Sequence, residues 1–216
     1  MLPQVALRLA ATVDDLPQLE QVLSEIEPNR TERTTVTSIY YDTAVAGLDR
    51  VGLALQVQKQ NGRYKQIVTT AELKEQPPLI RCEWEDFIDG ERPDLGAPNS
   101  SAHLPKALNE AELQARFATV VQRTACTLEP DASTEIVGAV DKGEIRTVED
   151  QRTEPIYEVE LQLKQGDPAA LYGTGLRLLE SALLRIEPRS KPERGCRLLE
   201  STTAKPQALH SLALRP

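Results

Sequence analysis

The feature that most constrains the fold is an alternation of apolar and polar residues with a period of two. It is clearest in residues 157–163, YEVELQL, where Tyr157, Val159, Leu161 and Leu163 are separated by polar residues. Because successive side chains of a strand point to opposite faces, this segment predicts a strand with one apolar and one charged face. The same alternation occurs in residues 5–9 and 53–58, and further strand-like runs span residues 35–42, 64–70, 81–87, 118–127 and 135–140.

Three segments with helical spacing interrupt the strands, at residues 12–26, 104–117 and 167–184. Thr12 or Asp14 is a candidate cap for the first, and Asp167-Pro168 is a typical helix start. Several short antiparallel strands favour a closed barrel or a sandwich, with helices covering the apolar face. The polar face is then either an exposed, solvated surface or the lining of a barrel.

Composition and missing motifs exclude several classes of protein. The net charge of −8 argues against nonspecific binding to nucleic acid or to an anionic membrane, and no continuous apolar run is long enough to span a bilayer. The first residues turn acidic without a basic region, so we interpret them as mature structure. Cys82, Cys126 and Cys196 form no CxxC pair, which predicts reduced thiols and a cytoplasmic protein. The sequence contains no phosphate-binding glycine loop.

Three motifs resemble those of the CYTH domain, the triphosphate tunnel metalloenzyme family. YYDT at residues 40–43, followed by LDRVGLAL at 48–55, is similar to the family's block that begins with YFDT. EPIYEVELQLKQGD at residues 154–167 is similar to its acidic strand, and RSKPERG at 189–195 is close to its basic block. Together these blocks place the resemblance over residues 2–200.

The resemblance implies an α+β fold: an eight-stranded antiparallel β-barrel, or tunnel, with flanking helices. Residues 1–204 would form this domain. Residues 205–216 would be a tail or linker, similar to the segment that leads to a CHAD domain in longer proteins. In such a tunnel, inward basic side chains hold a triphosphate, and inward glutamates hold Mg²⁺ or Mn²⁺.

The sequence departs from the family pattern at several of these inward positions. The family's Glu-x-Glu-x-Lys signature aligns with residues 4–8, where both glutamates are lost and Arg8 replaces the lysine. Neutral residues align with other expected charges: Gln56, Gln58, Thr69 or Thr70, Val120 and Val137. These losses predict a degenerate site, because a triphosphate needs many positive groups and a metal needs several carboxylates.

The remaining charged residues are the candidate site. Glu158 and Glu160 are the candidate metal ligands, for Mg²⁺ or Mn²⁺ if the protein is active, although two carboxylates alone are a poor magnesium site. The candidate substrate-binding residues are Arg8, Arg81, Arg123, Lys142, Arg189, Lys191 and Arg194. Both the glutamates and the basic residues have a structural alternative. They could lie on a solvated face, or the glutamates could form ion pairs with the arginines. No catalytic residue is identified.

We therefore predict a CYTH-fold module with a degenerate triphosphate tunnel, inactive or weakly active, that binds a phosphate-rich anion or serves as a scaffold. One alternative is a working metal-dependent inorganic triphosphatase. Another is an interaction domain in a system of CHAD domains and polyphosphate. The expected partners are inorganic triphosphate or polyphosphate and a CHAD domain, without nucleic acid or membrane.

Overall fold

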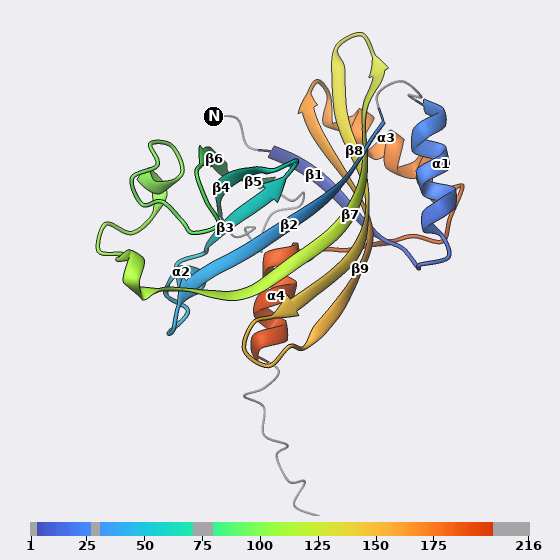
Figure 1. The fold of residues 1–216 in the computed structure, drawn as a ribbon. Helices are drawn as coiled ribbons and strands as arrows, with labels where there is room; N and C mark the ends of the chain where they lie inside the picture. Colours follow the sequence, from blue (N-terminus) through green and yellow to red (C-terminus); the bar gives the residue numbers. More distant parts are fainter. Residues whose placement is uncertain (1–3, 27–30, 71–79, 201–216) are drawn as a thin grey trace, which may run out of the picture.

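A computed structural model describes residues 4–26, 31–70 and 80–200 of the chain (Figure 1). The predicted linker at residues 205–216 lies outside them. The helices are α1 (Leu16–Ile26), α2 (Gly47–Arg50), α3 (Pro168–Leu179) and α4 (Lys191–Glu200), with short 3-10 turns at Ser101–His103 and Glu110–Glu112. The strands are β1 (Gln4–Ala10), β2 (Glu32–Thr43), β3 (Leu53–Gln60), β4 (Arg63–Thr70), β5 (Ile80–Arg81), β6 (Glu83–Ile88), β7 (Leu113–Asp131), β8 (Thr134–Thr147), β9 (Thr153–Gln165) and β10 (Arg185–Ile186). The predicted α+β class is confirmed.

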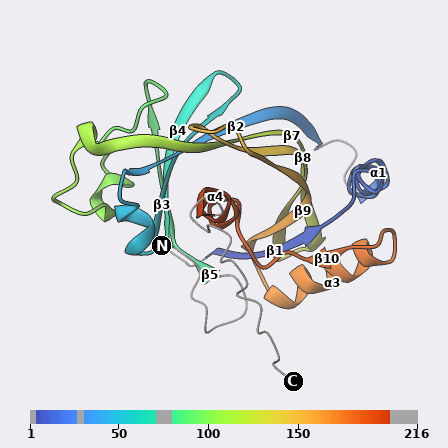
Figure 2. The ribbon, with the colours of Figure 1, turned by 90° about the horizontal axis from the view of Figure 1, so that it is seen from below.

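The strands form one antiparallel sheet in the order β10-β1-β9-β8-β7-β2-β3-β4-β6. The described sheet has ten strands instead of the predicted eight, because the two-residue strands β5 and β10 both pair with β1. The run predicted as one strand at residues 81–87 is divided at Cys82, so that β5 pairs with β1 and β6 pairs with β4. The sheet is strongly curved, and α4 lies inside the curve (Figure 2).

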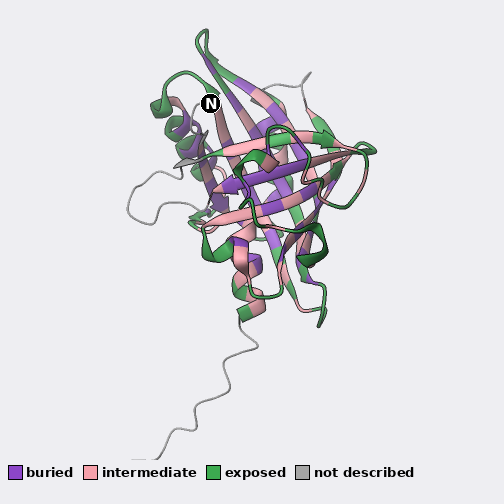
Figure 3. Ribbon diagram, turned by 90° about the vertical axis from the view of Figure 1, so that its left-hand side faces the viewer, coloured by how far each residue is buried: buried purple, intermediate pink, exposed green. Residues whose placement is uncertain are grey.

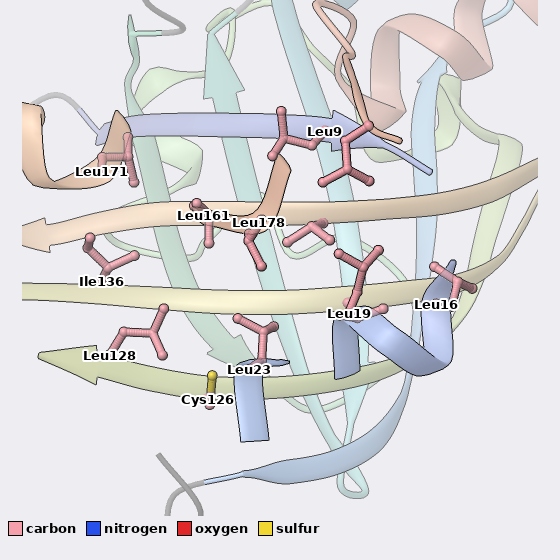
Figure 4. Packing of buried hydrophobic residues seen from close by; sticks show 13 residues of the cluster. Leu9, Leu16, Leu19, Leu23, Cys126, Leu128, Ile136, Leu161, Leu171 and Leu178 are labelled. Carbon is pink, nitrogen blue, oxygen red and sulfur yellow. The ribbon is translucent and has the colours of Figure 1, made fainter. Parts of the chain in front are cut away.

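The main core lies on the convex side of the sheet, under α1 and α3. Leu16, Leu19 and Leu23 of α1 are buried against β7, β8 and β9, and Leu171 and Leu178 of α3 are buried in the same cluster (Figure 4). Complete burial of each leucine contributes about 1.5–3 kcal/mol, so this layer fixes the outward face of β9. Buried residues follow the strands, and exposed residues gather in the connections (Figure 3). The prediction that helices cover the apolar face is confirmed.

The predicted helix at residues 104–117 is wrong. Leu104 and Leu108 lie in an irregular segment and pack on the outer side of β3 and β4, with Leu48, Leu55 and Val68. From Leu113 onward the chain is strand β7, which pairs with β2. The helical spacing of the leucines arises because both contact the same sheet face, and pairing with β2 outweighs the weak local helix preference.

Both other predicted helices are present, but shorter. Residues 12–15 form a turn in which the Asp15 carboxylate accepts hydrogen bonds from the Thr12 N–H and hydroxyl, at 3.0 and 2.6 Å, so α1 begins only at Leu16. Asp167 caps α3 as predicted, by accepting a hydrogen bond from the Ala169 N–H at 2.8 Å, and the helix ends at Leu179. Among the described residues, no helix is long and apolar enough to cross a membrane.

Helix α4 was not predicted, although its start carries a recognisable signal. Ser190 and Glu193 form a capping box: the Glu193 carboxylate accepts from the Ser190 N–H at 2.8 Å, and the Ser190 hydroxyl accepts from the Glu193 N–H at 3.4 Å. Gly195 lies against the Phe117 ring so closely that a Cβ atom there would overlap it. The helix therefore packs directly on the concave face of the sheet, with Lys191 and Arg194 pointing toward β8 and β9.

Candidate functional site

A polar chamber of about 230 Å³ lies on the concave side of the sheet. Its wall comes from β1, β2, β3, β4, β6, β7 and β9, and the first residues of α4 close one side. The charged side chains that line it are Arg8, Lys65, Glu83, Glu85, Arg123, Glu160, Lys164 and Lys191. The alternating strands thus place their polar faces inside, while the apolar faces pack under α1 and α3.

Asp141 of β8 is the centre of an ion-pair network in the wall of the chamber. Its carboxylate is buried and accepts two hydrogen bonds from Arg123, from Nε and Nη2, both at 2.7 Å. Lys191 Nζ lies 2.9 Å from the same carboxylate, forms an ion pair with Glu158, and lies 3.9 Å from Glu160. One cation from β7 and one from α4 therefore share three carboxylates of β8 and β9.

Arg194 anchors the other side of the network. Its Nη1 donates to Glu158 at 2.9 Å, its Nε donates to Glu154 at 2.7 Å, and its Nη2 donates to the Pro155 carbonyl at 2.6 Å. Arg194 is buried and lies behind Glu158. It holds α4 on β9, so its contacts are those of a structural residue.

The electrostatics of the network favour the charged forms of Asp141, Lys191 and Arg123. Burial by itself would raise the pKa of Asp141, but the opposite effect of Lys191 and Arg123 is larger and holds that pKa well below its usual range. Burial would lower the pKa of Lys191, but Asp141, Glu158 and Glu160 outweigh it and raise that pKa. The pKa of Arg123 is raised in the same way, against burial, by Asp141 and then by Glu160.

Arg8 lies on the inward face of β1, directly opposite Glu160 in the register with β9. It is almost completely buried, and its Nη2 donates to the Pro188 carbonyl at 3.3 Å. Arg8, Arg123 and Lys191 are three of the five cations that line the chamber, and they come from three different elements. Converging positive groups of this kind can hold an anion through several oxygens at once.

The wall formed by β3 has a different chemistry. Gln56, Gln58 and Gln60 follow one another along its inward face, and Gln162 of β9 also lines the chamber. Thr69 of β4 lines it as well, and on β7 the inward residues are Thr119 and Val121. Val120, which the sequence alignment suggested for the tunnel, is 46% exposed on the opposite face. This part of the wall offers amides and hydroxyls in place of charges.

The structure brings together only some of the predicted substrate-binding residues. Arg8, Arg123 and Lys191 line the chamber, whereas Lys142 is exposed on the opposite face of β8. Arg189 pairs with Glu187, with Nε 2.9 Å from Oε1, and is not among the residues that line the chamber. Arg81 belongs to β5, and its side chain lies outside the described part of the structure.

The predicted metal ligands are already engaged by cations. Glu158 is bound by Lys191 and Arg194, and Glu160 lies 3.4 Å from Arg123. Within the described residues, no three carboxylate, histidine or cysteine side chains are arranged to hold a metal ion. Carboxylates that neutralise ammonium and guanidinium groups do not fit a divalent cation in this arrangement, since the metal would have to displace those groups.

The residue that the sequence pattern missed is Asp141. It lies in an alternating strand, on the same face as Ala139, and precedes Lys142 and Gly143. Its charge was visible in the sequence, but its partners Arg123 and Lys191 are 18 and 50 residues away along the chain. Only the pairing of β7 with β8, together with the packing of α4, places these groups in contact.

The site thus lies on the charged, concave face of a curved antiparallel sheet. The CYTH domain model matches residues 3–195, so this chain belongs to the CYTH family. A putative adenylyl cyclase from Hippeastrum, described as having a dominant triphosphatase activity, matches with a TM-score of 0.61 and 16% identity, over 95% of this chain and 98% of that one.

Two further solved structures have the same fold. A putative adenylate cyclase from Bacillus halodurans matches with a TM-score of 0.57 and 13% identity, over 88% of this chain and 96% of its own. A protein of Pyrococcus horikoshii matches with a TM-score of 0.53 and 16% identity, over 92% and 99%. At these identities, the similarity establishes the fold alone.

Proposed function

We propose that this chain is a CYTH module that binds a phosphate-rich anion in its chamber and has lost efficient hydrolysis. The observation that carries the proposal is the network around Asp141, in which Lys191, Arg123 and Arg194 occupy the carboxylates. An efficient triphosphatase of this family would need those carboxylates for a metal, and would need more free cations for the substrate. Here the protein's own cations neutralise them.

The proposal includes closure of the sheet into a tunnel. Residues 80–88 would close it, because β6 continues the sheet from β4 while β5, one residue earlier, pairs with β1. Paired residues at this seam are Gln4 with Arg81 and Val5 with Ile80. A closed wall would exclude water from the chamber and strengthen charge interactions inside it.

Anion binding in such a chamber is expected to be weak. A phosphate group that approaches Arg123 or Lys191 must compete with Asp141, which already accepts two hydrogen bonds from Arg123. Lys164 is exposed at the chamber wall, so it can meet an anion without breaking a buried ion pair. The amides of Gln56 and Gln58 can donate to phosphate oxygens, but a neutral donor holds an anion less strongly than a charged one.

The experiment measures thermal stabilisation by tripolyphosphate and, in parallel, phosphate release from it with Mg²⁺ and with Mn²⁺. We expect a concentration-dependent shift with little or no release. Lys164→Ala should reduce the shift, and Lys142→Ala is the matched control, because Lys142 is an exposed lysine on the opposite face of the sheet.

Two results would overturn the proposal. Rapid release that Glu160→Gln abolishes would show a working metal-dependent triphosphatase. Absence of both shift and release would show that the chamber does not bind a phosphate-rich anion, leaving a scaffold role.

A further inference from the structure

The ammonium group of Lys191 is surrounded by carboxylates from two neighbouring strands. Its Nζ lies 2.9 Å from Asp141, forms an ion pair with Glu158 and lies 3.9 Å from Glu160. The side chains of Asp141 and Glu158 are 0% and 1% exposed, and that of Lys191 is 13% exposed. Proteins hold Mg²⁺ and Ca²⁺ through carboxylate oxygens in a similar way. Here the cation between the carboxylates belongs to the chain itself.

The docking of α4 fixes the position of Lys191. Arg194, almost one turn later on the same helix, donates to Glu154 at 2.7 Å and to Glu158 at 2.9 Å. Withdrawal of Lys191 would leave Asp141 and Glu158 buried with fewer counter-charges, which is strongly unfavourable. Lys191 is therefore a resident cation that a dissolved metal ion cannot easily displace.

The lining of the chamber favours an anion over a metal ion. Basic side chains outnumber acidic ones, with Arg8, Lys65, Arg123, Lys164 and Lys191 against Glu83, Glu85 and Glu160. Two of these acidic residues are paired within the wall, since Lys65 lies 2.9 Å from Glu85 and Arg123 lies 3.4 Å from Glu160. A metal ion that entered with an anion would meet ammonium and guanidinium groups where it needs carboxylate oxygens.

This lining distinguishes two forms of a polyphosphate, the free anion and its complex with Mg²⁺. The free anion presents all of its oxygens and its whole charge to the basic side chains. The complex carries two fewer negative charges, and its metal ion keeps several water molecules. Placed near Asp141, that metal ion would also lie beside Lys191 and Arg123, and like charges repel one another strongly at short distances.

We infer that Lys191 takes the place of a divalent metal ion, so that the chamber selects the metal-free form of a polyphosphate over its Mg²⁺ complex. The inference rests on the proposed function, because it concerns the anion bound in the same chamber. The expected effect of Mg²⁺ is opposite to that in a metal-dependent triphosphatase, where the metal ion helps to hold the phosphate oxygens. In this chain, Mg²⁺ weakens binding by converting the anion into the form that the chamber disfavours.

Isothermal titration of the full chain with tripolyphosphate tests the inference in two buffers, one with EDTA and one with excess Mg²⁺. The buffers need equal ionic strength, because screening alone weakens the binding of an anion. We expect Mg²⁺ to weaken the affinity about tenfold or more, as for the loss of one charge-assisted contact.

The ratio of the two dissociation constants tests the role of Lys191. In Lys191→Ala, Asp141 and Glu158 can accept the metal ion of the complex, so Mg²⁺ should no longer weaken the affinity. Lys142→Ala is the matched control, because it removes an exposed lysine on the opposite face of β8, and it should keep the wild-type ratio. If Lys191→Ala does not fold, the comparison of the two buffers with the wild type still decides.

The outcomes separate the inference from the proposed function. Wild-type affinity that Mg²⁺ leaves unchanged or strengthens would overturn the inference and leave the proposed function in place. A folded Lys191→Ala variant with the wild-type ratio would overturn the role of Lys191. Absence of binding in both buffers would overturn the proposed function, and the inference with it.

Discussion

The two sides of the chamber differ in how their polar groups are satisfied. On the side of β8, β9 and α4, cations and carboxylates satisfy one another, as Arg123, Asp141 and Lys191 do. On the side of β3, the inward face carries Gln56, Gln58 and Gln60. On the first side the charges thus have partners within the wall, and on the β3 side the inward residues are neutral. The first side is held together by its own ion pairs, whereas the second offers neutral amides to the chamber.

The largest expected effect comes from breaking the ionic side. Lys191→Met leaves Asp141 and Glu158 buried with fewer counter-charges, which should lower the free energy of unfolding by about 3 kcal/mol or more. Urea unfolding measures this loss. Lys142→Met, at an exposed lysine of β8, should change it by less than about 0.5 kcal/mol. Equal effects of the two variants would contradict a structural role for the network.

The docking of α4 gives the next largest effect. Gly195→Ala forces a methyl group into the Phe117 ring and should destabilise the protein by about 1–3 kcal/mol. Gly173→Ala is the opposite case, because nothing lies near its Cβ position, and it should stabilise the helix by about 0.5–1 kcal/mol. Thermal unfolding of both variants separates the two outcomes. A neutral Gly195→Ala would mean that α4 can move off the sheet easily.

The network should also shape the dependence of stability on pH. The lowered pKa of Asp141 means that its contribution is complete above about pH 4 and decreases as the pH falls below that value, by about 1.4 kcal/mol per pH unit. The raised pKa of Lys191 means that its contribution is complete below about pH 10 and is lost as the pH rises through the folded value.

Urea unfolding at a series of pH values tests this dependence. The difference between the wild type and a combined Asp141→Asn, Lys191→Met variant isolates these two groups from the many other carboxylates. The difference should be constant between about pH 5 and pH 9 and shrink toward both extremes. A constant difference over the whole range would show that neither group has a shifted pKa.

The smallest effect comes from adding charge to the amide side. Gln56→Arg and Gln58→Arg together place cations at positions that line the chamber, and should raise tripolyphosphate affinity about fivefold, or about 1 kcal/mol. Isothermal titration of the variant and the wild type measures the change. Val120→Arg, which places a cation on the opposite face, should have no effect. If the chamber variant gained nothing, these glutamines would not lie at the binding surface.

Much of the fold could be predicted because alternation is a local property. Period-two patterns located the strands around residues 157–163 and 53–58, and the residues Asp167-Pro168 correctly marked the start of α3. The errors came from non-local effects. Leu104 and Leu108 imitate a helix because both pack on one sheet face, and the Ser190–Glu193 capping box, although present in the sequence, was not used to predict a helix.

The candidate site was less predictable because it depends on which strands are neighbours. Arg8, Arg123 and Lys191 were predicted to bind substrate, and they line the chamber. Lys142 and Arg189 were predicted on the same grounds, but they do not line it. Alternation determines that Asp141 and Lys142 point to opposite faces, but it does not say which face is inside. That choice depends on the apolar cluster under α1 and α3, which buries one face and turns the other inward.

By itself, the sequence determined the family, most of the strands and the neutral character of Gln56, Gln58 and Gln60 on β3, because these features depend on residue types and short spacings. Only the tertiary structure decided that the remaining charges neutralise one another. Asp141 and Lys191 are 50 residues apart in the sequence, yet the Lys191 Nζ lies 2.9 Å from the Asp141 carboxylate. Local sequence patterns do not encode this contact, which makes the two side chains an ion pair with each other. Coulomb interactions depend on distance in space, and the fold sets that distance.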